Sequence, residues 1–171
     1  MPKLEALNEF MQQFPTLALS HPVGQRLFRE VTTGMAETLA PKTWFRGAGQ
    51  KAITAERFLP NPTEPQRPYR FNHSGQPALY LAAEAETAVV EALQERKANT
   101  AKLWIAQIAI EKELRVLNFN AAKTSSLFLE VLLLSSLLRT PRKKPGHFQP
   151  QYLLTRLLAD IARRKGFDGI L

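Results

Sequence analysis

The chain has 171 residues, of which 44% are hydrophobic, so it is long enough for one well-packed domain and too short for two comfortable ones. It contains no cysteine, which excludes a disulfide framework and a thiolate metal site. Lys and Arg outnumber Asp and Glu by 23 to 15. The resulting net charge of +8 fits either a solvated basic surface or an anionic partner, such as a nucleic acid, an acidic protein or a phosphorylated small molecule.

Residues 1–41 predict an N-terminal helical extension that precedes a main domain over 42–171. The segment 3–14 carries apolar residues at helical spacing. A second helix is predicted to begin after His21, and its apolar stripe continues to Leu39. Because His21 stands beside a proline, a loop or cap role is favoured over a ligand role.

The main domain is predicted to begin with a short aromatic strand, Thr43 to Arg46, which places Arg46 at a strand end. At Gly47 and Gly49, which follow, a backbone can approach a ligand closely. These glycines are not a dinucleotide fingerprint, because the third glycine and the helix are missing. The proline-rich segment 51–68 predicts a stiff loop long enough to cover a pocket.

A turn, a short strand and a helix are predicted next. Gly75 and Pro77 favour the turn, the apolar run Ala78–Ala82 has strand length, and residues 86–97 have helical periodicity.

This segment places an arginine, a tyrosine and a glutamate near the edges of successive elements: Arg70, Tyr80 and Glu91. A polar loop between rigid elements is a common place for reactive side chains. Periodicity alone makes Glu91 a solvated surface glutamate, because it lies off the apolar stripe of its helix.

Two strands and two helices are predicted in the second half of the chain. Residues 102–110 alternate and are rich in strand formers, and 114–119 form a second strand. The segment 124–139 is apolar nearly all round, which predicts a buried helix. A last helix over 149–165 has one apolar face and ends at a glycine, and 168–171 predict a turn into a strand.

No export or membrane signal is recognised in the sequence. The first residues lack the apolar core of a secretory signal. The longest apolar run, Leu127 to Leu138, contains Glu130 and is shorter than the roughly 20 residues that cross a bilayer. We expect a cytoplasmic protein without a membrane span; a secreted effector that acts in a target cytoplasm is the open alternative.

Several motifs occur in order between residues 43 and 171: Trp44-Phe45-Arg46-Gly47, Arg70-Phe71-Asn72 with Gly75, Ala78-Leu79-Tyr80-Leu81-Ala82, Thr87-Ala88-Val89-Val90-Glu91, and Tyr152 through Gly166-Phe167-Asp168-Gly169-Ile170. Together they resemble the RES domain. That family is named for its arginine, glutamate and serine, and it is known as the toxin half of bacterial Xre-RES toxin-antitoxin pairs.

The resemblance implies an α+β fold with a mixed-sheet core similar to ADP-ribosyltransferases of the diphtheria-toxin kind, and an activity that destroys NAD. NAD is then a substrate, and neither a cofactor nor a metal is expected. The family's catalytic residues map onto Arg70, Tyr80 and Glu91. Contacts to NAD are expected from three further residues: Arg46, Gly47 and Asn72. In the family, the serine follows the Gly-Ile pair by a few residues, whereas the sequence here ends at Leu171. We therefore expect either that the chain is truncated or that another residue takes the role of the serine. Ser125 and Ser126 fit helix capping better.

The chemistry suits these residue types. Cleavage of the nicotinamide-ribose bond passes through an oxocarbenium-like ribose, which a carboxylate such as Glu91 stabilises. The ring of Tyr80 can stack on nicotinamide, and Arg70, with Arg46, can pair with the pyrophosphate.

The acceptor stays open in the sequence. Water or phosphate would make the reaction a hydrolysis or a phosphorolysis, and a macromolecular acceptor would make the chain an ADP-ribosyltransferase. A non-catalytic basic module that binds nucleic acid or a partner is the alternative from another class, suggested by the +8 charge and the run Arg142-Lys143-Lys144. An Xre-like antitoxin or an immunity protein is the expected partner, and nucleic acid is expected only indirectly, through an antitoxin.

Overall fold

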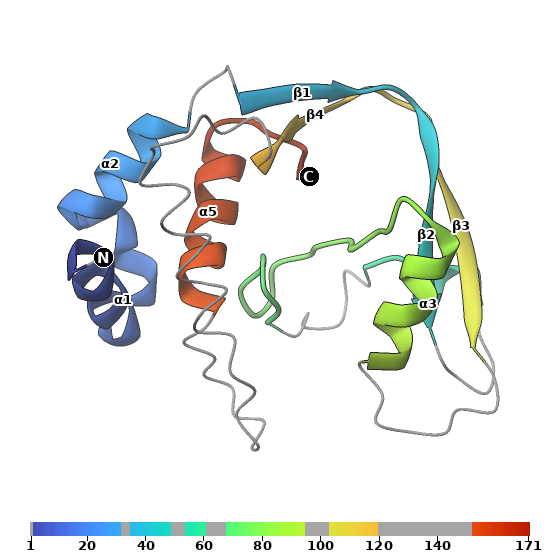
Figure 1. Cartoon of the computed structure of the whole chain (residues 1–171), viewed down its shortest axis with the longest axis horizontal. Helices are drawn as coiled ribbons and strands as arrows, with labels where there is room; N and C mark the ends of the chain where they lie inside the picture. Colours follow the sequence, from blue (N-terminus) through green and yellow to red (C-terminus); the bar gives the residue numbers. More distant parts are fainter. Residues whose placement is uncertain (1, 32–34, 49–53, 61–67, 95–102, 120–151) are drawn as a thin grey trace. The chain divides into compact units, whose positions relative to one another are not determined.

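In the computed structural model, the chain folds into two compact units, whose elements are labelled in Figure 1. Unit 1 comprises Met1–Leu39, Pro68–Ser74 and Leu114–Leu171, and unit 2 comprises Ala40–Arg67 and Gly75–Glu113. The described residues are 2–31, 35–48, 54–60, 68–94, 103–119 and 152–171.

Some predicted features lie outside the described residues. These are the helix over 124–139, with Ser125 and Ser126 near its start, the basic run 142–144, and much of the proline-rich loop 51–68. The predicted boundary between residues 41 and 42 stays a prediction, because each unit is assembled from more than one stretch of chain.

Helices dominate the described part of unit 1. They are α1 (Pro2–Gln13), the 3-10 helix η1 (Pro15–Ser20), α2 (Pro22–Glu30) and α5 (Leu153–Arg164). The first helix is confirmed. Nδ1 of His21 accepts a hydrogen bond from the backbone N–H of Val23 at 3.2 Å, which satisfies a donor at the start of α2. Of the loop and cap roles that the sequence favours for His21, the structure shows the cap.

The apolar faces of these helices share one hydrophobic core. Leu4 and Leu7 of α1 and Leu27 of α2 are fully buried in it. The predicted apolar face of α5 is buried in the same core through Leu154, Leu157, Leu158 and Ile161. Each buried leucine contributes about 1.5–3 kcal/mol, so the N-terminal helices and α5 stabilise one another.

A three-stranded mixed sheet completes unit 1, in the order β1-β4-β5. β1 (Ala36–Leu39) runs antiparallel to β4 (Leu114–Leu117), and β5 (Gly169–Ile170) runs parallel to β4, which confirms the strands predicted around 114–119 and after 168. The helix predicted to reach Leu39 is wrong over β1. Its apolar spacing also fits a strand, and pairing with β4 decides between the two.

The end of α5 is joined to this sheet. Gly166 has a φ of 71°, which glycine adopts without strain, and the helix ends there as predicted. Arg115 of β4 donates from Nη1 to the carbonyl of Lys165 at 2.9 Å, and its backbone N–H donates to Oδ2 of Asp168 at 2.9 Å. These bonds fix the C-terminal end of α5 within unit 1.

Unit 2 is built on a two-stranded antiparallel sheet. β2 (Lys42–Ala48) pairs with β3 (Trp104–Ile110) in a register that sets Phe45 opposite Gln107. Both predicted strands are confirmed. The predicted helix is confirmed as α3 (Ala85–Gln94), which begins one residue earlier than expected and packs against β2.

The strand predicted over Ala78–Ala82 is wrong. Of these described residues only Ala82 pairs, through two hydrogen bonds with Phe45 at 2.8 and 2.9 Å. The chain bends at residues 83–84 into α3, so the apolar run forms one bridge and no ladder.

The described residues therefore form an α+β protein, as the sequence predicts at the level of fold class. Among the helices of the described stretches, none is both long enough and apolar enough to cross a membrane.

Candidate functional site

Arg70 lies in a tight turn of unit 1 over residues 69–73. The backbone N–H of Tyr69 donates to the carbonyl of Asn72 at 3.2 Å, which closes the turn. Asn72 is only 1% exposed, and its side-chain amide donates to the carbonyl of His73 at 3.1 Å. Asn72 thus stabilises the turn, and its predicted contact with NAD stays a prediction.

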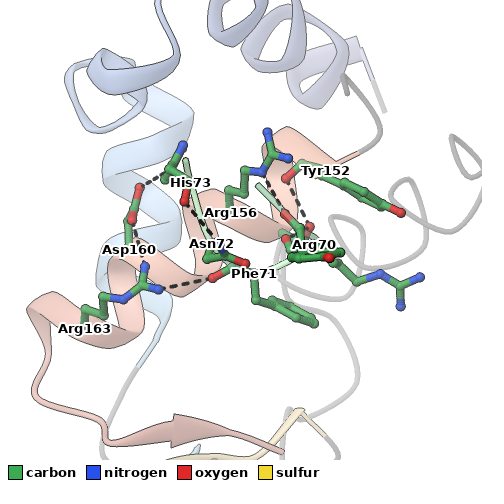
Figure 2. Close-up of polar contacts among 10 residues, drawn as sticks. Arg70, Phe71, Asn72, His73, Tyr152, Arg156, Asp160 and Arg163 are labelled. Atoms are coloured by element: carbon green, nitrogen blue, oxygen red, sulfur yellow. Dashed lines mark hydrogen bonds and ion pairs between the residues drawn. The ribbon is translucent and has the colours of Figure 1, made fainter. Parts of the chain in front are cut away.

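Side chains of helix α5 bind the backbone carbonyl groups of this turn. Three of its side chains donate to three successive carbonyl groups: Arg156 Nε to Tyr69 at 2.9 Å, Thr155 Oγ1 to Arg70 at 2.6 Å, and Arg163 Nη2 to Phe71 at 3.3 Å (Figure 2). The turn is therefore attached to α5 along its length.

A further contact anchors the end of the turn. Nε2 of His73 lies 2.9 Å from Oδ2 of Asp160, and Nη1 of Arg163 lies 3.3 Å from Oδ1 of the same carboxylate. Asp160 thus links His73 to an arginine that also binds the turn (Figure 2).

Helical spacing explains why one face of α5 serves the turn. Residues 152, 156, 160 and 163 follow one another at intervals of four, four and three, so they form a single stripe, and Thr155 lies beside it. The apolar core residues occupy the other side. Although this stripe is polar, Thr155 is 4% exposed and Arg156 is 5% exposed.

The side chain of Arg70 points away from the carbonyl groups that α5 holds (Figure 2). Its guanidinium carbon lies 6.0 Å from the ring centroid of Tyr152, and that of Arg156 lies 5.6 Å from the same ring. Among the described residues, none forms a hydrogen bond or ion pair with the Arg70 side chain. A partly buried cation of this kind suits an anionic ligand.

Unit 2 holds the predicted residues Arg46 and Gly47 on β2. Nη1 of Arg46 donates to the carbonyl of Phe58, at the end of the 3-10 helix η3 (Ala55–Phe58), at 2.9 Å. A Cβ on Gly47 would lie 2.5 Å from the carbonyl oxygen of Ala88. The absence of a side chain at Gly47 therefore lets β2 approach α3 closely, and its predicted contact with NAD stays a prediction.

Tyr80 and Glu91 also belong to unit 2. Tyr80 is half-buried in the extended segment that leads to the Phe45–Ala82 bridge. Glu91 is exposed on α3, off the buried stripe of Ala88 and Ala92, as periodicity predicts. The carboxylate of Glu91 has no hydrogen bond or ion pair with any of the described residues.

The predicted residues are thus divided between the units. Arg70 and Asn72 share the turn of unit 1, whereas unit 2 contains Arg46, Gly47, Tyr80 and Glu91 on β2, on α3 and on the segment between Gly75 and α3. Their catalytic and binding roles stay predictions.

Other sites are less promising. A hollow of about 270 Å³ in unit 1 is lined by Leu19, Gln25, Phe28, Arg29 and Arg164, none of which is a predicted site residue. Within the described stretches, no group of three or more His, Asp or Glu residues is arranged to hold a metal ion.

Sequence reasoning missed the residues of α5 that hold Arg70. Thr155, Arg156 and Asp160 stand on the polar side of an amphipathic pattern, which usually faces solvent. A signal was present: Tyr152, Arg156, Asp160 and Arg163 repeat at helical spacing, and a polar stripe with an aromatic residue can face a second layer of structure.

The family model described as the RES domain matches residues 41–171 of the chain. This span covers more than half of the chain and contains all six predicted site residues. Comparison with curated proteins and with solved structures finds no match.

Proposed function

The chain belongs to the RES domain family, and from this membership we propose that it depletes NAD by cleaving the N-glycosidic bond between nicotinamide and ribose. The observation that carries the proposal is the family match over residues 41–171, which includes Arg70, Tyr80 and Glu91. The proposed fold relatives are ADP-ribosyltransferases of the diphtheria-toxin kind, which the α+β class supports.

The proposed reaction transfers the ADP-ribosyl group from nicotinamide to water or phosphate. The bond between C1' and the pyridinium nitrogen breaks, and its electron pair stays on nicotinamide, which leaves as a neutral molecule. The acceptor oxygen bonds to C1'; a water acceptor releases a proton to solvent, whereas phosphate bonds through an oxygen that is already anionic. Because the ribose passes through an oxocarbenium-like state, the protein must stabilise positive charge there and keep the rest of NAD still.

Glu91 is the proposed source of that stabilisation. Its carboxylate is exposed and has no charged partner among the described residues, so no neighbouring cation there neutralises it. A negative charge placed next to C1' and the 2'-hydroxyl would favour the oxocarbenium state over the ground state.

Arg70 is the proposed partner of the NAD pyrophosphate. Its backbone is fixed by α5 and its guanidinium points away from those bonds (Figure 2). A planar guanidinium pairs with two phosphate oxygens at once, which fixes orientation as well as position. Arg46, whose Nη1 is hydrogen bonded to Phe58, is the second proposed contact.

Tyr80 is proposed to stack on the nicotinamide ring. The side chain is half-buried, which is compatible with one ring face packed on protein and the other on a ligand. Stacking against a positively charged pyridinium adds a cation–π attraction that is lost when the ring leaves as neutral nicotinamide.

Expression in bacteria tests the proposal in cells. The chain is placed under a repressible promoter, and cellular NAD is measured by enzymatic cycling after induction. We expect NAD to fall with the wild-type chain and to stay level with Glu91→Gln at matched protein levels. Unchanged NAD in cells that contain soluble, folded wild-type protein would contradict the proposed function.

An inhibitory partner follows from the same proposal. A cell that makes an NAD-depleting enzyme in its cytoplasm needs a protein that blocks it, and an Xre-like antitoxin is the proposed partner. The product of the neighbouring reading frame should co-purify with the chain and restore NAD levels. A neighbour that neither binds nor protects would count against a toxin-antitoxin role.

A further inference from the structure

One face of α5 is specialised for the turn that carries Arg70. We propose that α5 is the positioning element of Arg70, and that Thr155, Arg156 and Tyr152 act on NAD through that arginine without touching the substrate. This rests on the proposed function, in which Arg70 binds the NAD pyrophosphate. It adds positioning residues on a helix whose spacing of apolar residues predicts only a core face.

The backbone of Arg70 is held on both sides of its Cα atom. Arg156 binds the carbonyl of Tyr69, which belongs to the peptide group before Arg70, and Thr155 binds the carbonyl of Arg70, which belongs to the peptide group after it. Because each peptide group is planar, fixing both carbonyls fixes both planes. The direction of the Cα–Cβ bond of Arg70 is therefore set by α5.

Burial makes these bonds hard to replace. Thr155 and Arg156 are 4% and 5% exposed, so water has little access to these two donors, and Arg70 is itself partly buried. The bond from Arg156 is also charge-assisted, which makes it stronger than a bond between neutral groups. A turn held in this way has few alternative conformations, and loss of one donor leaves a carbonyl of the turn without that partner.

The guanidinium of Arg70 has a contact of its own with this region. Its carbon lies 6.0 Å from the ring centroid of Tyr152, at the outer limit of a cation–π contact. Tyr152 directly precedes α5, and its ring is also 5.6 Å from the guanidinium carbon of Arg156. Tyr152 thus connects the cation that holds the backbone with the cation that is proposed to bind NAD.

A purely structural role for this face makes a different prediction. If Thr155 and Tyr152 only stabilised the fold, their substitution would lower the melting temperature and leave the KM of the folded enzyme unchanged. If they position Arg70, substitution raises KM for NAD, because a mobile arginine binds pyrophosphate less well, while kcat changes less.

The first test is a set of three variants assayed by steady-state NAD cleavage. Thr155→Val removes the hydroxyl and keeps the size, Thr155→Ser keeps the hydroxyl, and Ile161→Val removes one methylene from the buried opposite face of α5. We expect Thr155→Val to raise KM by about two- to tenfold, the equivalent of one hydrogen bond, and Thr155→Ser to stay close to wild type. Ile161→Val should lower the melting temperature without changing KM.

A second pair of variants tests the contact with the guanidinium. Tyr152→Leu removes the ring, and Tyr152→Phe keeps it. We expect Tyr152→Leu to raise KM more than Tyr152→Phe. Equal KM values for the two variants would overturn the role assigned to the Tyr152 ring.

Amide hydrogen exchange provides a readout that does not depend on activity. The N–H of Tyr69 is bonded to Asn72 within the turn, so exchange over residues 69–73 should be faster in Thr155→Val than in wild type and unchanged in Ile161→Val. Equal exchange in Thr155→Val and wild type would overturn the proposal that Thr155 holds the turn in place. Faster exchange with an unchanged KM would overturn the positioning role. No NAD cleavage by the wild-type protein would instead refute the proposed function, and the positioning role with it.

Discussion

Replacement of Glu91 by glutamine separates a functional from a structural role for this residue. The side chain is exposed on α3 and has no hydrogen bond or ion pair with the described residues. Exposed substitutions of this kind change the free energy of unfolding by less than about 0.5 kcal/mol. For a chain of this length such a change shifts the melting temperature by about 1–2 °C.

The expected effect on catalysis is much larger. Glutamine keeps the shape of the side chain and loses the negative charge that is proposed to stabilise the oxocarbenium. Removal of one preorganised electrostatic group lowers kcat by roughly 10²-fold or more, which corresponds to about 2.7 kcal/mol in the activation barrier. Destabilisation of the fold by about 0.5 kcal/mol cannot produce a loss of that size in a protein that stays folded.

Glu86→Gln is the matched control, because Glu86 is also exposed on α3 and lies in its first turn. Its loss removes a favourable interaction with the helix dipole, so the control should cost at least as much stability as Glu91→Gln. Release of nicotinamide from NAD is measured at saturating substrate, and unfolding is followed by circular dichroism. Wild-type turnover in Glu91→Gln would refute the reasoning and make Glu91 an ordinary solvated residue.

Three further predictions concern the other site residues. Arg70→Lys should raise KM for NAD by a larger factor than it lowers kcat, because an ammonium cannot form the bidentate pair. A fall in kcat by the same factor as the rise in KM would argue against a binding role. Tyr80→Ala should reduce activity more than Tyr80→Phe if stacking matters more than the hydroxyl, and an equal loss in the two variants would assign the role to the hydroxyl. Gly47→Ala should lower the free energy of unfolding by about 1–3 kcal/mol in a urea titration, because the added Cβ would lie 2.5 Å from the carbonyl oxygen of Ala88; unchanged stability would contradict the close packing of β2 on α3.

The elements with strong local patterns could be predicted from the sequence. The alternation of Trp104–Ile110 and the spacing of the α1 and α5 leucines specify strand and helix without help from the rest of the chain. The proline after His21 favours a loop or cap role for this histidine over a ligand role. In the structure it is a cap, because its side chain accepts from an N–H group at the start of α2.

The elements that depend on distant partners were not predictable in this way. Ala36–Leu39 continues an apolar helical spacing but forms β1, because it pairs with β4. That partner lies far along the chain, so the local sequence does not reveal it. The run Ala78–Ala82 has the composition of a strand and makes a single bridge, because the chain bends into α3 directly afterwards. A strand needs a partner, and a single sequence does not show which partner is available.

The candidate site shows the same division between local and distant information. The motifs around Arg70 and Glu91 were recognisable as short sequences, and the exposure of Glu91 followed from periodicity. The residues that hold Arg70 in place could not be recognised from the sequence. Thr155 and Arg156 are polar residues, and their burial depends on a turn more than 80 positions earlier in the chain. Polar residues on an amphipathic helix usually face water, so only the tertiary contact reveals their role.

The central claim is tested most directly by product analysis with the purified protein. NAD is incubated with wild-type protein in phosphate-free buffer and in phosphate buffer, and the products are separated and quantified. Cleavage at the nicotinamide-ribose bond predicts one nicotinamide released for each NAD consumed. The other product is ADP-ribose when water is the acceptor, or ADP-ribose phosphorylated at the same C1' atom when phosphate is the acceptor. Intact NAD in both buffers, or NAD consumed without release of nicotinamide, would contradict the claim.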